Sequence, residues 1–78
     1  MQLYFKRLKD LREDNDFSQL DIAQILKVRR QTYADYENGT STIKTKHLIT
    51  LSKLYKVSID YIVGNTDIKE LYPKPKKN

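Results

Sequence analysis

Apolar residues recur at every third or fourth position in short runs, and this spacing constrains the fold more than any other feature. Phe5, Leu8 and Leu11 repeat at intervals of three, and Ile22 and Leu26 share one face of a second run. Such spacing is that of an amphipathic α-helix, whereas a half-buried strand needs alternating apolar and polar residues. Strand-like alternation is missing throughout the sequence. The periodicity therefore predicts an all-α fold.

Start and stop signals divide this pattern into about five short helices. Ser18 and Asp21 have the spacing of a capping box, which opens the second helix, and Ser58 is a suitable N-cap for the last one. Asn38 and Gly39 follow the third helix as a common stop signal. The predicted helices span residues 3–14, 18–26, 29–37, 45–55 and 58–63. A compact bundle of short helices is therefore expected.

The chain length limits this bundle to one domain, because 78 residues can bury only a single small core. We expect the domain to cover residues 1–66. Ile68, Leu71 and Tyr72 leave room for one more helical turn, after which the sequence PKPKKN offers nothing apolar to pack. Residues 67–78 are therefore expected to form a basic tail that is partly disordered.

The charge of the chain makes a polyanion the first partner to consider. Its net charge is +5 and its isoelectric point is about 9.5. The surplus is uneven, since residues 27–46 carry five basic against two acidic side chains, whereas residues 5–21 carry four basic against five acidic ones. The basic middle of the chain is therefore the expected contact surface.

Several classes of function are disfavoured by what the sequence lacks. Without cysteine there is no disulfide, thiol catalysis or thiolate-bound zinc, and the single histidine, His47, cannot build a metal site. His47 also has no nucleophile or carboxylate beside it in a recognisable catalytic motif, so no enzyme is expected. Apolar runs reach only two or three residues, too short for a membrane span. We expect a cytoplasmic protein without cofactor, metal, small-molecule ligand or membrane contact.

The second and third predicted helices fit a helix-turn-helix, in which the second helix of the pair enters the major groove of DNA. Tyr33, Tyr36 and Glu37 share the inward face of residues 29–37 by their spacing. The opposite face is polar apart from one small alanine, and it carries Arg30, Gln31, Ala34 and Asp35. This outward face is the expected DNA-reading surface.

Three segments resemble successive signatures of one known family, the phage-repressor/Cro-like (XRE-type) helix-turn-helix proteins. They are FSQLDIAQIL, VRRQTYADYENG and LSKLYKVSIDYIVG, and they occur in the order and at the spacing of that family. The resemblance covers roughly residues 5–67. It implies a lambda-repressor-like fold and a sequence-specific transcriptional regulator of double-stranded DNA, with repression as the expected effect.

The resemblance assigns base reading to the same outward face that the periodicity selects. It places Arg30, Gln31 and Asp35 at base-reading positions, with Ala34 beside them. Arg30 can donate two parallel bonds to guanine, and Gln31 can pair with adenine. In the family, the residue at the position of Gln19 holds a phosphate and braces the recognition helix. Contacts that position the protein on the DNA backbone are expected from Gln19, Arg29, Thr32, Thr40, Lys44 and Lys46.

Asp35 is unusual at its position, and three interpretations stay open. Its carboxylate can accept a bond from cytosine in the major groove. It lies one turn from Gln31 and close to Arg30, so it can also orient these side chains before DNA arrives. In the third interpretation Asp35 marks a helix that has lost tight DNA binding. A mixture of orientation and cytosine selection is favoured, because a carboxylate aimed at phosphates only repels them.

The resemblance also implies two structural roles. Arg12 and Glu37 are expected to form a partly buried salt bridge between the first and third helices. The last helix is expected to mediate homodimerisation, at least on DNA, through Ile59, Ile62 and Val63.

The turn before the third helix departs from the family pattern at two positions. Lys27 replaces the usual glycine, so a left-handed residue there would carry some strain. Arg29 stands where the family has a small N-cap, and an arginine side chain cannot cap a helix N-terminus.

A different class of function stays open beside the regulator. The same fold can serve as a protein-binding module, such as an antitoxin or an antagonist of a related repressor, which predicts weak and uniform DNA binding. A basic protein that binds DNA without sequence preference is a third possibility, and a steep salt dependence without specificity would identify it. The regulator predicts a specificity ratio of about 10³ or more.

Overall fold

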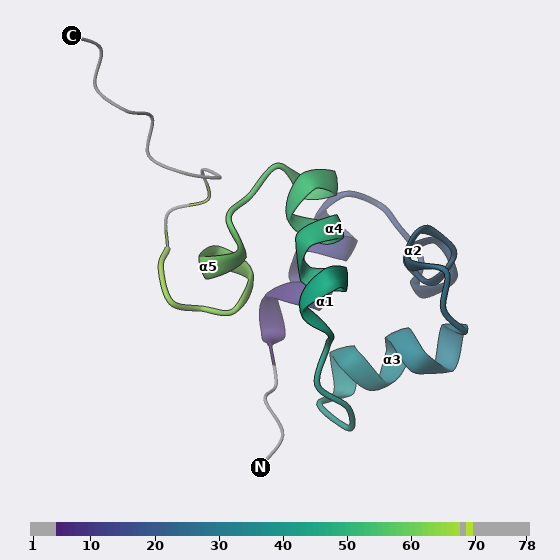
Figure 1. The fold of residues 1–78 in the computed structure, drawn as a ribbon. Helices are drawn as coiled ribbons and strands as arrows, with labels where there is room; N and C mark the ends of the chain where they lie inside the picture. Colours follow the sequence, from purple (N-terminus) through teal and green to yellow (C-terminus); the bar gives the residue numbers. More distant parts are fainter. Residues whose placement is uncertain (1–4, 68, 70–78) are drawn as a thin grey trace, which may run out of the picture.

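The chain folds into five α-helices and the turns between them (Figure 1). This computed structural model describes residues 5–67 and 69. The helices are α1 (Lys6–Asp14), α2 (Gln19–Leu26), α3 (Arg30–Asn38), α4 (Thr45–Tyr55) and α5 (Ile59–Ile62). Within the described residues there is no strand, and the predicted all-α fold is confirmed. The bounds of α2 to α5 agree with the predicted ones to within one residue, whereas α1 begins at Lys6 rather than near residue 3.

Each helix contributes at least one fully buried side chain to a single apolar core. The largest of these side chains belong to Leu8, Ile22, Tyr33, Leu51 and Ile62, and each is at most 1% exposed. Burying an aliphatic or aromatic side chain of this size stabilises a fold by roughly 1.5–3 kcal/mol relative to leaving it exposed. Because every helix is anchored in the same core, the orientation of one helix depends on all the others.

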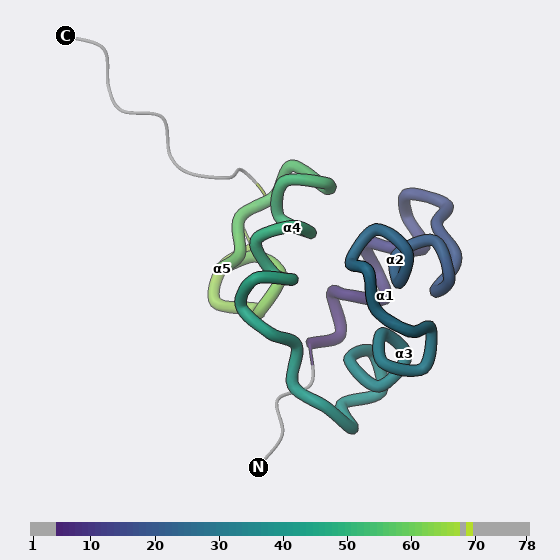
Figure 2. Tube along the Cα trace, turned by 45° about the vertical axis from the view of Figure 1, so that its right-hand side comes forward, coloured from purple at the N-terminus to yellow at the C-terminus, as the bar shows by residue number. Residues whose placement is uncertain are grey.

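The helices form two groups around this core. α2 packs against α3, and α4 packs against α5, while α1 contacts both α3 and α5. Figure 2 shows α4 and α5 on one side of the molecule and α1 to α3 on the other. The two groups are joined by the loop 39–44, which leads from the end of α3 to the start of α4. The loop therefore places the start of α4 next to the predicted recognition helix.

Local sequence signals fix both ends of α2. The Ser18 hydroxyl accepts a hydrogen bond from the backbone N–H of Asp21, and the Asp21 carboxylate accepts one from the backbone N–H of Ser18, which completes the predicted capping box. At the other end Lys27 is left-handed, with φ 60° and ψ 43°. The backbone N–H of Val28 donates to the Ala23 carbonyl at 2.9 Å and closes the last turn. A left-handed lysine costs on the order of 1 kcal/mol, which is the strain expected from the missing glycine.

The segment after α5 folds back onto α1 and α5 through Arg7. The guanidinium of Arg7 donates hydrogen bonds to the backbone carbonyl oxygens of Tyr61 at 2.9 Å and of Thr66 at 2.6 Å. It also forms an ion pair with Asp67 and lies 4.0 Å from the centre of the Tyr61 ring. A backbone hydrogen bond of 2.9 Å from Ser58 to Lys69 adds a second attachment.

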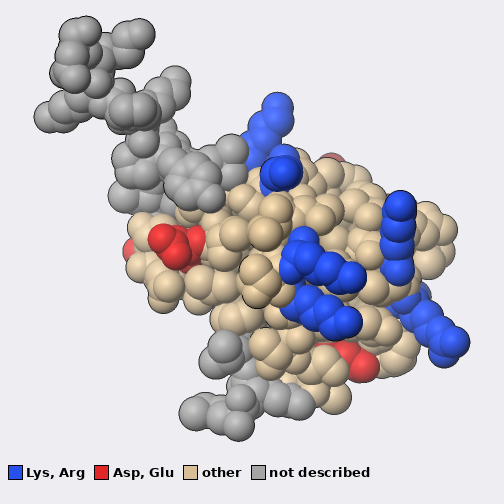
Figure 3. Space-filling view, in the orientation of Figure 1, with Lys and Arg blue, Asp and Glu red and all other residues tan. Residues whose placement is uncertain are grey.

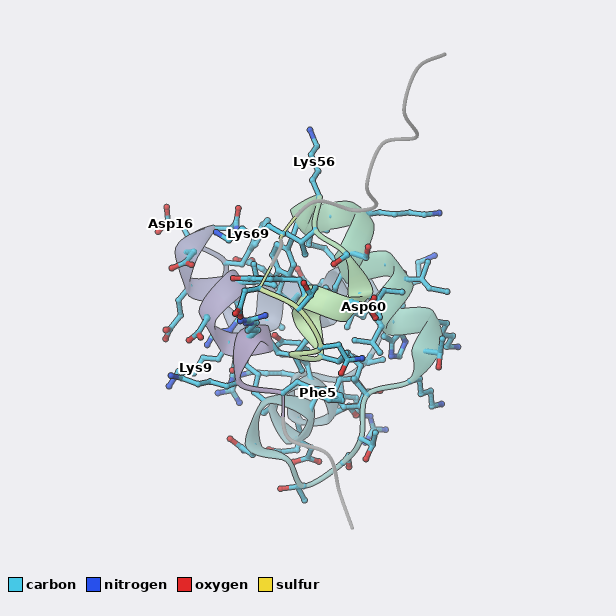
Figure 4. All side chains as sticks on the ribbon, turned by 90° about the vertical axis from the view of Figure 1, so that its left-hand side faces the viewer. Phe5, Lys9, Asp16, Lys56, Asp60 and Lys69 are labelled. Atoms are coloured by element: carbon cyan, nitrogen blue, oxygen red, sulfur yellow. The ribbon has the colours of Figure 1, made fainter. Side chains whose placement is uncertain are left out.

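These contacts continue past the predicted domain boundary. Beyond residue 66, Asp67 and Lys69 each contact the helical part of the chain, and Lys69 lies on the side of the molecule viewed in Figure 4. The remainder of the predicted tail, together with the extra helical turn expected around Ile68, Leu71 and Tyr72, lies outside the described residues.

Candidate nucleic-acid interface

Helix α3 turns its predicted inward residues toward the core. Tyr33, Tyr36 and Glu37 are each at most 5% exposed, whereas Arg30 and Gln31 are exposed at the start of the helix. Asp35, one turn further along, is partly exposed. Arg30, Gln31 and Asp35 therefore lie on the accessible side of α3, as the periodicity predicts.

Ala34 points to the same side of α3 as Arg30 and Gln31 by its spacing, but it is buried there rather than exposed. The residue is only 7% exposed and belongs to the buried set of α3. Its side chain is a single methyl group, so little surrounding surface is needed to bury it. Helical spacing gives the direction of a side chain but not the height of its neighbours, so it could not reveal this burial.

Gln31 and Asp35 are joined by a hydrogen bond along the surface of α3. The Gln31 Nε2 donates to Asp35 Oδ1 at 2.9 Å, across one helical turn. This contact corresponds to the orienting interpretation of Asp35, with Gln31 as the oriented residue. The amide of Gln31 keeps one N–H and its carbonyl oxygen for other partners. That donor and that acceptor are the pair needed to match the N7 and N6 of adenine.

Behind this surface, Glu37 is the centre of a polar network between three helices. Arg12 on α1 donates from Nε to Glu37 Oε2 at 2.6 Å and from Nη2 to Oε1 at 3.2 Å. Gln19 at the start of α2 donates from Nε2 to Glu37 Oε1 at 3.1 Å. The structure thus places the predicted salt-bridge partners in bidentate contact, and it places Gln19 where it braces the end of α3.

The protonation of Glu37 follows from these partners. Burial acts to raise the pKa of the carboxyl group, but hydrogen bonds from Arg12 and Gln19, together with the nearby Tyr33 hydroxyl, outweigh it and hold the pKa below its ordinary value. The hydrogen bond with Glu37 in turn raises the pKa of Arg12. The pair is therefore ionised at neutral pH and fixes α3 from the inside.

The six residues predicted to contact the DNA backbone surround α3. Gln19 starts α2, Arg29 precedes α3, Thr32 lies in its first turn, Thr40 lies in the following loop, Lys44 precedes α4, and Lys46 lies in its first turn. All are exposed except Gln19 and Thr32, which are half-buried. Figure 3 shows basic side chains gathered over α4 and around the turn between α2 and α3, with few acidic ones among them.

Lys44 and Lys46 line an open crevice between the α2–α3 turn and the start of α4. We call it the lysine crevice. Its volume is about 510 Å³. Its lining residues are Ile25, Leu26, Lys27, Val28, Lys44, Lys46, His47 and Thr50. Three cations thus surround one concave surface, at a size that accommodates a phosphate group.

His47 forms part of the wall of the lysine crevice and is only 6% exposed. Its Nδ1 lies 3.1 Å from the hydroxyl of Tyr36 on α3, and the two rings are 5.8 Å apart. Burial, followed by the charges of Lys46 and Lys44, lowers the pKa of His47 below its ordinary value. The imidazole is therefore neutral at pH 7 and connects α4 to the recognition helix.

Neither Lys27 nor His47 is among the DNA-contacting residues predicted from the sequence. For Lys27 the signal was present, because a lysine in place of the turn glycine puts a cation beside the recognition helix. For His47 the spacing to Leu48 and Leu51 indicates the inward face of α4, but no pattern in the sequence reveals its contact with Tyr36.

The predicted dimerisation residues are only partly accessible. Ile62 is 1% exposed and belongs to the core, so its predicted place on a dimer surface is wrong. The four-residue helix α5 turns Ile62 inward and leaves Ile59 and Val63 half-buried. Val63 also borders a shallow groove that is largely apolar. This groove is lined by Phe5, Thr42, Ile43, Thr45, Leu48, Val63 and Asn65.

Two other kinds of site do not occur in the part of the chain that the structure describes. Among residues 5–67 and 69 there is no group of three or more histidine, aspartate or glutamate side chains that could hold a metal ion. Over the same residues, no helix is long and apolar enough to cross a membrane.

A sequence model described as helix-turn-helix matches residues 8–62, which include all of α2, α3 and α4. The chain belongs to the XRE-type helix-turn-helix family. Relatives in this family are DNA-binding transcriptional regulators, which are typically not enzymes, and double-stranded DNA is the ligand of the family's helix-turn-helix.

Individual relatives share different lengths of the chain. The HTH-type transcriptional regulator YobD of Bacillus subtilis is 30% identical in an alignment of 83 positions, gaps included, which covers 94% of this chain and 74% of YobD. The antitoxin PezA of Streptococcus pneumoniae serotype 4 is 37% identical over 59 residues, or 76% of this chain but only 37% of PezA. The crystal structure of a transcriptional regulator from Listeria innocua matches with a TM-score of 0.73 at 28% identity, covering 100% of this chain and 67% of the other.

Proposed function

We propose that this XRE-type helix-turn-helix protein is a sequence-specific repressor that reads the major groove with α3 and acts in the cytoplasm. One observation carries the proposal: α3 exposes Arg30 and Gln31 while Glu37, at its other end, is fixed by Arg12 and Gln19. A reading helix must present its side chains in one orientation, because loosely held contacts lose discrimination. Occupation of a promoter by such a protein excludes other DNA-binding proteins and so represses.

The reading residues have complementary roles. Arg30 donates two parallel bonds to the O6 and N7 of a guanine. Gln31, held by Asp35, uses its remaining N–H and its carbonyl oxygen for an adenine. Asp35 keeps a second carboxylate oxygen, Oδ2, which can accept from the N4 of a cytosine. Each good contact of this kind contributes roughly 1–3 kcal/mol of discrimination against the wrong base.

The residues around α3 supply affinity and register. Arg29, Thr32 and Thr40 hold phosphates on either side of the recognition helix, with Gln19 at the start of α2. Lys44 and Lys46, joined by Lys27 across the lysine crevice, hold a further phosphate. Contacts of this type carry no sequence information, but each cation that neutralises a phosphate steepens the dependence of affinity on salt.

A homodimer would double the length of the site. Ile59 and Val63 are half-buried in the single chain, and the adjoining groove exposes apolar surface that a second copy can cover. Two recognition helices related by a two-fold axis then read half-sites about 34–36 Å apart, one turn of the duplex. The operator is therefore expected to be a palindrome.

Selection from randomised duplex DNA tests the proposal. The purified protein is carried through several rounds at near-physiological salt, beside the double variant Arg30→Ala, Gln31→Ala and the control Lys53→Ala, which changes an exposed cation near the far end of α4. We expect the wild type and the control to enrich one palindrome and the double variant to lose it. Failure of the wild type to enrich any sequence would refute sequence-specific regulation.

A second candidate function is an antitoxin, and the similarity to PezA over 76% of the chain favours it specifically. In that case the helix-turn-helix fold serves to bind a protein, alone or in addition to DNA. A partner encoded next to this chain would then co-purify with it in a fixed ratio. Co-expression of the neighbouring gene, followed by size-exclusion chromatography, distinguishes this function from a free-standing repressor.

A further inference from the structure

His47 lies between the lysine crevice and the recognition helix. Its ring forms part of the wall of the lysine crevice and contacts the Tyr36 hydroxyl on α3 through Nδ1. At 6% exposure it is almost fully removed from water, and the accessible remainder borders the crevice. It is also the only histidine in the chain. A change in its charge would therefore be felt at the phosphate site and at α3 together.

The charged groups facing His47 are all basic. Lys44 and Lys46 come from the start of its own helix, and Lys27 comes from the α2–α3 turn across the crevice. From α3 the facing group is the hydroxyl of Tyr36. No carboxylate lines the crevice among the described residues. In the free protein a proton on His47 would therefore be repelled by several cations at once.

We propose that His47 takes up a proton when a DNA phosphate occupies the lysine crevice, so that acidic pH strengthens DNA binding. This inference rests on the proposed DNA-binding function. In this step one proton moves from solvent to the imidazole of His47, which becomes an imidazolium. The phosphate already carries its negative charge and takes up no proton. Tyr36 permits both states, because its hydroxyl can donate to a neutral Nδ1 or accept from a protonated one.

The direction of the effect follows from the two charge environments. Without DNA, burial and the neighbouring lysines hold the pKa of His47 below its ordinary value of 6.5. A phosphate placed among those lysines offsets their repulsion and attracts the imidazolium. DNA adds little further burial, since the ring is already removed from water. The pKa is therefore higher in the complex than in the free protein, and by linkage the affinity rises as pH falls.

Binding measured at three pH values tests this. The probes are the duplex enriched by selection and a scrambled duplex of equal length, titrated by fluorescence anisotropy at pH 7.5, 6.5 and 5.5 at constant salt. The variant His47→Gln keeps an amide that can bond Tyr36 but cannot take up a proton. We expect wild-type affinity to increase by about tenfold for each unit that separates the two pKa values, with no such increase in the variant. An equal pH dependence in both proteins would overturn the inference.

A direct measurement covers the case in which the variant does not fold. Because His47 is the only histidine, its ring protons give a single set of NMR signals, which can be titrated in the free protein and in the DNA complex. We expect the midpoint to be at higher pH in the complex, and an unchanged or lower midpoint would overturn the inference. Loss of preference for the enriched duplex at pH 7.5 would instead contradict the proposed function and remove both.

Discussion

Glu37 shows how a single buried charge can orient a recognition helix. It is 5% exposed and accepts hydrogen bonds from Arg12 and Gln19, which belong to two other helices. A buried carboxylate is tolerated only when such partners compensate for the loss of water. Because these partners come from α1 and α2, the charge holds α3 in one position relative to both.

Neutralising Glu37 should therefore destabilise the fold. Glu37→Gln leaves the Arg12 guanidinium buried without its counter-charge, and we expect the free energy of unfolding to fall by about 3 kcal/mol. The free energy of unfolding is measured by urea titration, with circular dichroism as the signal. The matched control is Glu13→Gln, since Glu13 lies 3.9 Å from Arg12 but its side chain is 54% exposed, and its loss should cost no more than about 0.5 kcal/mol. Equal losses in the two variants would contradict the network.

His47 predicts a pH dependence of stability in the free protein. Its pKa is lowered in the folded state, so between the folded and unfolded pKa values the unfolded chain binds more protons. The free energy of unfolding should thus be constant at higher pH and decrease as pH falls below about 6.5. Glu37 has the same sign but acts below its ordinary value of 4.5, so the two windows are separate. In His47→Gln, the free energy of unfolding measured with urea between pH 7.5 and 5.5 should lack this decrease. If it decreases with pH as steeply as in the wild type, a group other than His47 causes the decrease.

At the scale of helices, the turn between α2 and α3 combines strain with charge. Lys27 is left-handed with φ 60°, and its side chain lines the lysine crevice opposite Lys44 and Lys46. Lys56, which follows α4, has nearly the same backbone conformation with φ 58° but is not part of that crevice. The two lysines therefore separate a backbone effect from a DNA-binding effect.

Glycine at each of these positions should have different consequences. Lys27→Gly and Lys56→Gly both relieve a left-handed side chain, and each should raise the free energy of unfolding by about 0.5–1 kcal/mol. Only Lys27→Gly removes a cation beside the phosphate site, so it alone should weaken DNA binding and reduce the salt slope by about one. Thermal unfolding and anisotropy titrations at several salt concentrations measure the two effects. A loss of affinity in Lys56→Gly of the same size would place the interface elsewhere.

Whole helices could be predicted well from the sequence because each signal is local. Helical spacing and the Ser18–Asp21 capping box depend on residues within one or two turns, and both are present in the structure. The errors at Ala34 and Ile62 have a common origin, since burial depends on neighbours from other elements that spacing does not specify. The hydrogen bond between Tyr36 and His47 joins two helices, so it could not be predicted from the sequence for the same reason.

For the molecule as a whole, a basic crevice and an apolar groove meet at the start of α4, where alternating residues line one or the other. Basic side chains gather over α4 and the α2–α3 turn, as Figure 3 shows, while the groove bordered by Val63 exposes apolar surface. One surface suits a polyanion and the other suits a second copy of the chain.

Pairing through the apolar groove predicts a defined response to substitution. Val63→Lys places a charge at the edge of the groove, and we expect it to abolish the dimer on operator DNA while leaving the fold intact, because Val63 is only half-buried. Light scattering after gel filtration, with and without the enriched duplex, gives the mass. The control Ile49→Lys changes an apolar side chain on α4 that is 42% exposed and outside the groove, and it should keep the dimer. Monomers in every sample of the wild type would exclude pairing.

The specificity ratio is the measurement that tests sequence reading by α3 most directly. It compares the affinity of the protein for the enriched duplex with that for a scrambled duplex of the same length at near-physiological salt. We expect a ratio of about 10³ or more for the wild type. Arg30→Ala, Gln31→Ala should lower it by about two orders of magnitude while leaving affinity for the scrambled duplex nearly unchanged. A ratio near one in the wild type, or an unchanged ratio in the variant, would show that α3 does not read DNA.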